Sequence, residues 1–490
     1  MKKIFLFLLY LSIYLQVHSQ DLSEAKHYAQ SIDKHDLQTH IKVLSSDSLA
    51  GRGMGSPGLK KAQDYIQSHF KKTGLQPMSD NYLQPFYLIK ETTGETYINI
   101  KDKRYENGVD FAFLGKTVFD QEIQSQLFYV DQLQDPTIHD HEKIISVAAF
   151  PSSKYLKTLP DNNEKGSVFI ISNRGEEANQ NTFEYLKKAS NNDLYFAAKP
   201  PEIKDETDAF LTSPRLVADA FGISVKQLMN WDKNTPNQKQ LRQINNPIIT
   251  IKTSKNYDTI VTANVIGFIE GSLHKNEILV ISAHYDHLGT IDSTYYPGAD
   301  DNGSGISALL EIAEAFKQAK ENDNGPARSL LFIAFTGEEE GLFGSSYFVE
   351  NPLIKLDDTM VNLNIDMIGR TDDFYNADTP YLYLIGSDKI SSELHQISEE
   401  VNQKTIQLKL DYRYNADNDP NRYYYRSDHF NFARHGIPVI FYFNGTHQDY
   451  HEVTDTENKI NYQLLQQRAQ LIFYTAWELA NREKRLKTDK

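Results

Sequence analysis

The second half of the chain carries histidine and carboxylate side chains of the kind that bind metal ions. Five of them and one spare carboxylate occur in the segments SAHYDH, GADDNGSG, TGEEEGL, NIDMIGR and DYHEVTDT, as His284, Asp301, Glu338, Glu339, Asp366 and His451. Imidazole and carboxylate groups suit zinc, manganese or cobalt. Two such ions side by side lower the pKa of a shared water, and a free carboxylate can accept its proton. The set therefore predicts a metal-dependent hydrolase.

Each of these motifs by itself is weak evidence for a metal site. Paired acids such as Asp300 and Asp301 are typical of solvated turns, and the His-x-Asp pattern at His284 is more often a structural pair. Asp366 is more informative, because it lies in an apolar run and a buried carboxylate is costly unless it is paired or bound to a metal. What favours a site is the placement of all the motifs together.

The elements that must position these residues are visible as apolar runs. Helical patterns separate five such runs, at residues 278–283, 329–335, 361–367, 381–386 and 438–443. Runs without alternation are typical of strands buried on both faces, and strand–helix alternation predicts an α/β fold with a mainly parallel sheet flanked by helices. Ligands of such sheets bind beyond the carboxyl ends of the strands. We therefore expect the candidate residues to meet at one sheet edge, with Asn302 as the N-cap of the helix after Asp301.

At 490 residues the chain is too long for one average domain. We predict that residues 20–90 and 259–490 form the catalytic domain, and that residues 91–258 form a smaller inserted domain of mixed strands and helices. Irregular elaboration of the main domain is the alternative for the middle segment. The glycine-rich stretch GRGMGSPG is not a phosphate loop, because it lacks the Gly-Lys-Ser/Thr ending and no strong strand precedes it.

Residues 1–19 are predicted to be a secretory signal peptide. Lys2 and Lys3 precede an apolar run that ends near Ser19, and a polar sequence follows. The run is short for a membrane span, although a retained anchor is the alternative. We therefore expect an exported protein, periplasmic or secreted, with no stable membrane insertion after cleavage.

The composition narrows the chemistry further. The chain has no cysteine, so any metal must be held by His, Asp and Glu rather than by thiolates. The formal net charge of -15 argues against nucleic acid as a partner. The composition thus favours a metal site with nitrogen and oxygen ligands in a protein that does not bind nucleic acid.

The motifs, in this order, resemble those of the co-catalytic zinc aminopeptidases of peptidase family M28. The resemblance covers residues 50–85 and 265–460. It implies the fold of that family, a phosphorylase/hydrolase-like mixed sheet flanked by helices. Within the middle segment, KGSVFIISNRG and SPRLVADAFGIS resemble a degenerate protease-associated domain, which would be inserted into the catalytic fold.

The resemblance also implies how the metal ligands are shared. Two Zn²⁺ ions, with Co²⁺ or Mn²⁺ as substitutes, would have Asp301 as a common bridge. His284 and Asp366 would complete one zinc site, and Glu339 and His451 would complete the other. Three carboxylates and two imidazoles would offset most of the charge of the two ions.

The remaining roles fall to residues beside these ligands. By the same resemblance, Glu338 would be the general base and Asp286 would orient His284. A cis peptide bond would follow Asp301. Tyr450 could donate a hydrogen bond to the oxyanion, although a packed aromatic residue is an equal alternative.

The leading hypothesis is an exported two-zinc aminopeptidase that releases N-terminal residues from peptides. A carboxypeptidase or dipeptidase on the same fold is the first alternative, and it would need cations for the substrate carboxylate. Arg370 and Arg426 lie near site motifs and could serve, or could pair with structural acids. A glutaminyl cyclase-like enzyme with one zinc is a further alternative. A catalytically dead binding module is disfavoured because the ligand set is intact.

Overall fold

The computed structural model describes residues 22–115, 119–134, 145–153, 167–189, 193–198, 208–375 and 379–490. The predicted signal peptide, residues 1–19, lies outside these ranges. Among the helices in these ranges, none combines the length and the apolar character needed to cross a membrane.

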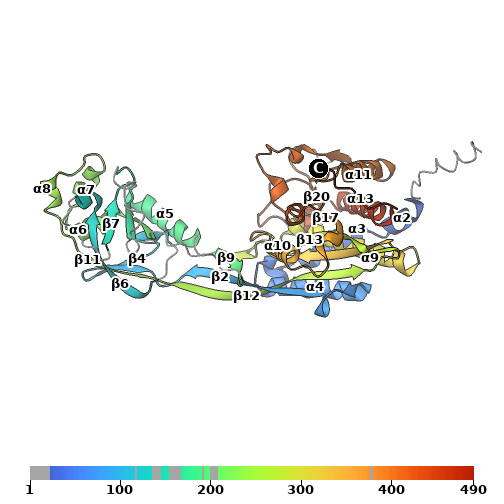
Figure 1. Ribbon diagram of the computed structural model, residues 1–490, viewed down its shortest axis with the longest axis horizontal. Helices are drawn as coiled ribbons and strands as arrows, with labels where there is room; N and C mark the ends of the chain where they lie inside the picture. The colour runs from blue at the N-terminus through green and yellow to red at the C-terminus, as the bar shows by residue number, and fades with distance from the viewer. Residues whose placement is uncertain are drawn as a thin grey trace, which may run out of the picture. The chain divides into compact units, whose positions relative to one another are not determined.

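The chain divides into two compact units, coloured by residue number in Figure 1. The first comprises Met1–Phe86 and Val261–Lys490, and the second comprises Tyr87–Ile260. The division falls within two long strands, β2 (Leu83–Thr93) and β12 (Lys255–Ile269). The domain boundaries that we expected, after residues 90 and 258, lie in the same two strands.

A mainly parallel mixed sheet forms the centre of the first unit, as predicted. Four neighbouring strands run parallel, namely β20 (Val439–Phe443), β17 (Thr359–Ile365), β13 (His274–His284) and β16 (Arg328–Phe335). On one side, β18 (Tyr381–Ile385) pairs antiparallel with β20 and parallel with β19 (Lys409–Asp411). On the other side, β12 pairs antiparallel with β16, and β1 (Gln76–Pro77) pairs with β12.

Helices cover both faces of this sheet, which explains why its strands are apolar without alternation. The helices on one face share a single core, and they are α2 (Leu22–Ala29), α3 (Lys34–Leu44), α4 (Pro57–Thr73), α9 (Gly305–Glu321), α11 (Ser392–Lys404) and α13 (Tyr462–Asn481). The other face packs against α10 (Phe343–Glu350) and α12 (His429–Ala433). Successive residues of β13 alternate between the two cores, as Val280 and Ile281 illustrate.

Helix α4 has start and stop signals that the sequence displays directly. The hydroxyl of Ser56 accepts a hydrogen bond from the N–H of Leu59, and Pro57 occupies the first turn. The helix ends at Gly74, whose φ of 81° lies in the left-handed region that glycine tolerates best. These signals fix the position of the glycine-rich loop that comes just before α4.

An eight-stranded mixed sheet with its own hydrophobic core forms the second unit. The strand order is β4 (Lys103–Glu106), β3 (Tyr97–Ile100), β11 (Ile248–Thr253), β6 (Phe119–Tyr129), β7 (Ile145–Ala149), β8 (Ser167–Ile171), β10 (Asp208–Thr212) and β5 (Phe111–Phe113). Its helices include α5 (Glu176–Ala189), α6 (Pro214–Phe221), α7 (Val225–Trp231) and α8 (Gln238–Leu241). β9 (Asp193–Phe196) pairs with the end of β2. The resemblance of this unit to a protease-associated domain remains a prediction.

Candidate metal centre

Residues that follow the carboxyl ends of neighbouring strands meet at one edge of the sheet in the first unit. β13 ends at His284, and Asp366 directly follows β17. Glu338 and Glu339 lie in the turn after β16, and His451 lies in the loop after β20. The strand-end argument predicts this convergence, because the four strands are parallel neighbours.

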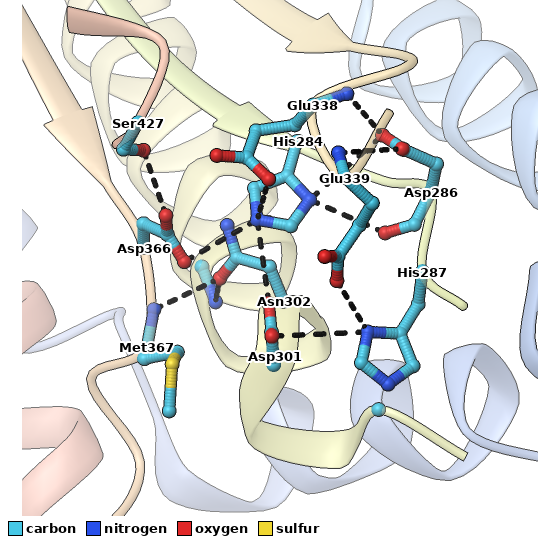
Figure 2. A network of polar contacts seen from close by, with 12 residues as sticks. His284, Asp286, His287, Asp301, Asn302, Glu338, Glu339, Asp366, Met367 and Ser427 are labelled. Atoms are coloured by element: carbon cyan, nitrogen blue, oxygen red, sulfur yellow. Dashed lines mark hydrogen bonds and ion pairs between the residues drawn. The ribbon is translucent and has the colours of Figure 1, made fainter. Parts of the chain in front are cut away.

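His284 is fixed by a hydrogen bond on one side of its buried ring. Its Nδ1–H donates to the backbone carbonyl oxygen of Asp286 at 3.2 Å. Nε2 therefore faces the opposite way, where it lies 3.3 Å from Oδ1 of Asp366 and 3.4 Å from Oδ1 of Asp301. Figure 2 shows these side chains converging. The carboxylate of Asp286, which we expected to orient His284, lies 3.8 Å from the same Nδ1, and the shorter contact is that of the backbone carbonyl.

The carboxylate of Asp286 also positions the turn after β16. Its two oxygens accept hydrogen bonds from the backbone N–H groups of Glu338 at 3.2 Å and Glu339 at 3.3 Å. Burial raises the pKa of Asp286 to about 6, and the nearby His284 opposes this shift. Asp286 thus connects the loop after β13 to the two glutamates (Figure 2).

Asp301 lies at the centre of the cluster and is buried. Its Oδ1 faces His284, whereas its Oδ2 lies 3.2 Å from Nε2 of His451. Its backbone N–H donates to Oδ2 of Asp455 at 3.1 Å. The peptide bond between Asp301 and Asn302 is cis, as the family resemblance implies. One carboxylate thus directs an oxygen at each of two imidazole groups.

Two histidines flank Glu339. Its Oε1 lies 2.7 Å from Nδ1 of His287, and its Oε2 lies 3.1 Å from Nε2 of His451. The side chain of His287 is fully buried, whereas that of His451 is 33% exposed. The sequence predicted His451 beside Glu339. His287 is an additional imidazole for which the sequence predicted no role.

Two groups within the described ranges have the donors and spacing of a metal site. One is His284, Asp301 and Asp366, and the other is His287, Asp301 and Glu339. The ligand atoms of each group lie within 4.8 Å of one another. Asp301 belongs to both groups, so the two could hold a pair of ions side by side.

Glu338 lies beside these groups without belonging to either. Its side chain is 9% exposed, and its Oε2 lies 3.9 Å from Nε2 of His284. Burial raises the pKa of Glu338 well above its usual value, His284 opposes the shift, and Asp366 and Glu339 add to it. A carboxyl group in such surroundings is suited to carrying a proton.

Asn302 connects the loop before α9 to the end of β17. Its Oδ1 accepts hydrogen bonds from the N–H groups of Gly305 at 2.9 Å and Met367 at 3.2 Å (Figure 2). Oδ1 of Asn302 accepts from the N–H three residues on, which is the bond that we expected of an N-cap, although α9 itself begins at Gly305 with Ser304 before it. The amide of Asn302 therefore also holds the start of α9 and the segment after β17 together across the site.

Arg52, in the glycine-rich stretch before α4, supports two loops that carry site residues. Its buried guanidinium donates to the carbonyl oxygens of Tyr285 and Gly298, each at 2.9 Å. A Cβ atom on Gly53 would lie 2.7 Å from the Cα of Gly289, so this approach requires glycine. The sequence alone did not predict that Arg52 positions these loops. The available signal for it was the number of glycines around Arg52.

A cavity of about 380 Å³ opens beside the two groups. The ring of Tyr450 stacks on that of His451 at its margin, with centroids 3.8 Å apart and planes at 25°. The apolar and aromatic part of the lining consists of Leu342, Met367, Tyr423, Tyr425, Phe441, Phe443 and Tyr450.

The sequence around this centre matches a known family. The profile of Peptidase family M28 matches residues 264–476, a range that contains His284, Asp301, Glu338, Glu339, Asp366 and His451. This part of the chain is a peptidase family M28 domain. The family predicted from the motifs is therefore confirmed.

The chain that carries this M28 domain is similar to known aminopeptidases. Aminopeptidase YwaD of Bacillus subtilis (strain 168) is 27% identical over 334 residues, which cover 66% of this chain and 65% of YwaD. Among solved structures, an aminopeptidase from Aneurinibacillus sp. strain AM-1 has a TM-score of 0.52 at 19% identity, covering 94% of this chain and 97% of that one. BSAP, a zinc aminopeptidase from Bacillus subtilis, has a TM-score of 0.51 at 20% identity, covering 92% of this chain and 96% of that one. These structures confirm the fold.

Proposed function

We propose that this protein is an exported two-zinc metallopeptidase that releases N-terminal residues from peptides. The observation that carries the proposal is the position of Asp301, whose oxygens face His284 at 3.4 Å and His451 at 3.2 Å. A carboxylate shared in this way suits two divalent ions a few ångströms apart. The M28 domain and the similarity to an aminopeptidase support the same function. Export rests on the predicted signal peptide.

The donor set fits zinc, which takes three protein ligands in catalytic sites. The proposed ligands are His284, Asp301 and Asp366 for one ion, and Asp301, Glu339 and His451 for the other. Nε2 of His451 lies 3.2 Å and 3.1 Å from two carboxylate oxygens, yet it has no hydrogen-bond partner among the described residues. Groups aimed at a common point rather than at each other would have this geometry. In this assignment His287 holds Glu339 in place.

Glu338 is the proposed proton carrier. Zinc bound at the two groups would supply a Lewis acid and an acidic water. Glu338, which binds neither ion in this assignment, would accept the proton of the attacking water and pass it to the leaving nitrogen. Tyr450 would donate a hydrogen bond to the oxyanion. Its hydroxyl oxygen accepts a hydrogen bond from Nη2 of Arg426 at 3.2 Å, which leaves its own hydrogen free to point elsewhere.

The alternatives account for less of the site. A glutaminyl cyclase-like enzyme with one zinc does not explain the second group around Glu339. A catalytically dead binding module does not explain a spare glutamate, Glu338, beside an intact ligand set. A carboxypeptidase or dipeptidase uses the same centre and differs in what receives the carboxylate of the substrate.

Metal removal and a blocked N-terminus test the proposal together. The protein should contain two zinc ions per chain and hydrolyse leucyl-p-nitroanilide. Chelation should abolish this activity, and zinc or cobalt should restore it. Acetylation of the substrate amine should slow cleavage by about a hundredfold or more, because a site built for a charged amine rejects a substrate without it. Activity that survives thorough metal removal would contradict the mechanism, and efficient cleavage of acetylated peptides would favour an endopeptidase or carboxypeptidase.

A further inference from the structure

The cavity beside the candidate metal centre has one lysine or arginine among the described residues that line it, Arg426. The carboxylates in the same lining are Asp301, Glu338, Glu339 and Asp366. Two divalent ions at the proposed sites would neutralise these four carboxylates. The guanidinium of Arg426 would then be the uncompensated charge of the cavity.

Arg426 has no carboxylate partner among the described residues. Its Nη2 donates to the hydroxyl oxygen of Tyr450 at 3.2 Å, and its Cζ lies 5.1 Å from the centre of the Tyr423 ring. Neither contact neutralises its charge. Arg370, the other arginine near the site motifs, is paired with Asp449 at 2.9 Å, and its side chain is 13% exposed. Of the two arginines that could bind a carboxylate, Arg426 is therefore the one that remains open.

The backbone of Arg426 is held beside the centre, and its exposed side chain has one hydrogen bond there. The next residue, Ser427, donates from Oγ to Oδ2 of Asp366 at 2.7 Å, so the backbone is connected to a proposed metal ligand. On the other side, Tyr450 contacts the guanidinium and stacks on His451. With a single hydrogen bond from Nη2, the guanidinium keeps N–H groups that can bind a carboxylate at two points.

We propose that Arg426 binds a carboxylate group of the peptide substrate while the scissile bond lies at the metal centre. This inference rests on the proposed peptidase function and names its substrate class, peptides with a carboxylate close to the scissile bond. The carboxylate can be the side chain of an N-terminal aspartate or glutamate, or the terminal carboxylate of a dipeptide. Both sources present the same planar, doubly accepting group to the guanidinium.

Two pairs of substrates test the proposal and distinguish the sources. Glutamyl- and glutaminyl-p-nitroanilide differ in a side-chain carboxylate, and Leu-Gly and its C-terminal amide differ in a terminal carboxylate. The wild type should favour the carboxylate member of at least one pair by about tenfold or more in kcat/KM. Arg426→Gln should bring that ratio to about 1, mainly through KM, and Arg426→Lys should retain part of it because lysine keeps the charge without the fork. The pair that responds identifies the carboxylate.

Arg422→Gln is the matched control, because Arg422 is exposed, lies over the ring of Tyr425 and does not line the cavity. It should keep the wild-type ratio, and all variants should contain the same amount of zinc. Equal ratios in the wild type and Arg426→Gln would overturn the inference, as would a wild type without preference in either pair. A wild type that hydrolyses none of these substrates, nor leucyl-p-nitroanilide, would overturn the proposed function and the inference with it.

Discussion

Asp301 illustrates how single side chains set the electrostatics of the candidate site. Burial favours the neutral carboxyl group, but the neighbouring imidazoles of His284 and His451 outweigh burial and hold the pKa of Asp301 well below its usual value. Burial also opposes the charged form of His451, yet Asp301 and Glu339 raise the pKa of His451 to about 10. Positive charge therefore stabilises the buried carboxylates at the place where the proposed ions would bind.

The variant Glu338→Gln separates the general base from the ligands. Glutamine has nearly the same shape but cannot accept a proton, so we expect kcat to fall by about 10²- to 10⁴-fold. Zinc content, measured by plasma mass spectrometry, should stay at the wild-type level because Glu338 binds neither ion in our assignment. Glu340→Gln, at an exposed neighbouring position, should keep near-normal turnover. Loss of zinc from Glu338→Gln would show that Glu338 is a ligand.

The same metal analysis distinguishes the two histidines beside Glu339. His451→Ala should lose one zinc ion per chain, because a proposed ligand is removed. His287→Gln should keep both ions but bind the weaker one about 10- to 100-fold less tightly, as expected for a residue that only orients a ligand. The reverse result, with an ion lost from the His287 variant alone, would exchange the roles of His287 and His451.

For single residues of the site, the sequence predicted which side chains lie close together but not which of their atoms make the contacts. Two arguments led to His284, Asp301 and His451, namely the position of these residues after the carboxyl ends of strands and the family resemblance. Both depend only on the order of residues along the chain. The direction of a side chain in a loop depends on local backbone angles, which chain order does not reveal. The carbonyl of Asp286 therefore makes the hydrogen bond to His284 while its carboxylate lies 3.8 Å away, and His287 lies beside Glu339 without having been assigned a role.

Secondary-structure elements were most predictable where the sheet is covered on both faces. The apolar runs of β13, β16, β17 and β20 are typical of strands buried on both faces, and their parallel direction was predicted from the helices between them. Loops that bridge elements were less predictable. Asn302 and Arg52 also bind backbone groups far away in sequence, and neither a capping rule nor a motif at their own position reveals these distant partners.

A buried polar chain links three of the helices on one face of the sheet. Nε2 of His40, on α3, lies 3.1 Å from Oε1 of Glu311, on α9. Nδ1 of the same ring lies 2.7 Å from the hydroxyl of Tyr65, on α4. Burial raises the pKa of Glu311 to about 8 and lowers that of His40 to about 4. Both residues are therefore neutral near pH 7, with Glu311 donating to His40 and His40 donating to Tyr65.

This arrangement predicts a pH-dependent stability that Glu311→Gln should remove. The pKa of Glu311 is about 8 in the folded protein against a usual value of 4.5, so its stabilisation is complete below pH 4.5 and is lost as the pH rises through 8. Glutamine donates the same hydrogen bond but cannot ionise. The stability of the variant relative to the wild type should therefore increase from pH 4.5 to 8, by up to about 5 kcal/mol in urea unfolding.

The control for this measurement is Glu321→Gln on the same helix. Glu321 is 62% exposed and pairs with Lys317 at the surface, so its stability curve should run parallel to that of the wild type. Parallel curves for Glu311→Gln and the wild type would contradict the neutral state of the buried pair.

In the whole molecule, each of the two compact units has its own hydrophobic core. The change in sequence character at residues 91 and 258, on which the domain prediction rests, lies close to the division between the units. The units are divided inside β2 and β12, and each strand continues through the division without a turn that could mark it in the sequence. All the proposed metal ligands, the proposed base and Arg426 belong to the first unit.

The first unit should therefore retain the chemistry when most of the second is removed. The N–H of Gly94 donates to the carbonyl oxygen of Ser254 at 2.7 Å, so a short Asn-Gly turn can replace the residues between them. The shortened protein should bind two zinc ions and hydrolyse leucyl-p-nitroanilide with a kcat/KM within about tenfold of the wild type. The same deletion combined with Glu338→Gln should be inactive, which excludes a contaminating peptidase. A folded, zinc-loaded deletion protein without turnover would mean that the second unit supplies part of the active site.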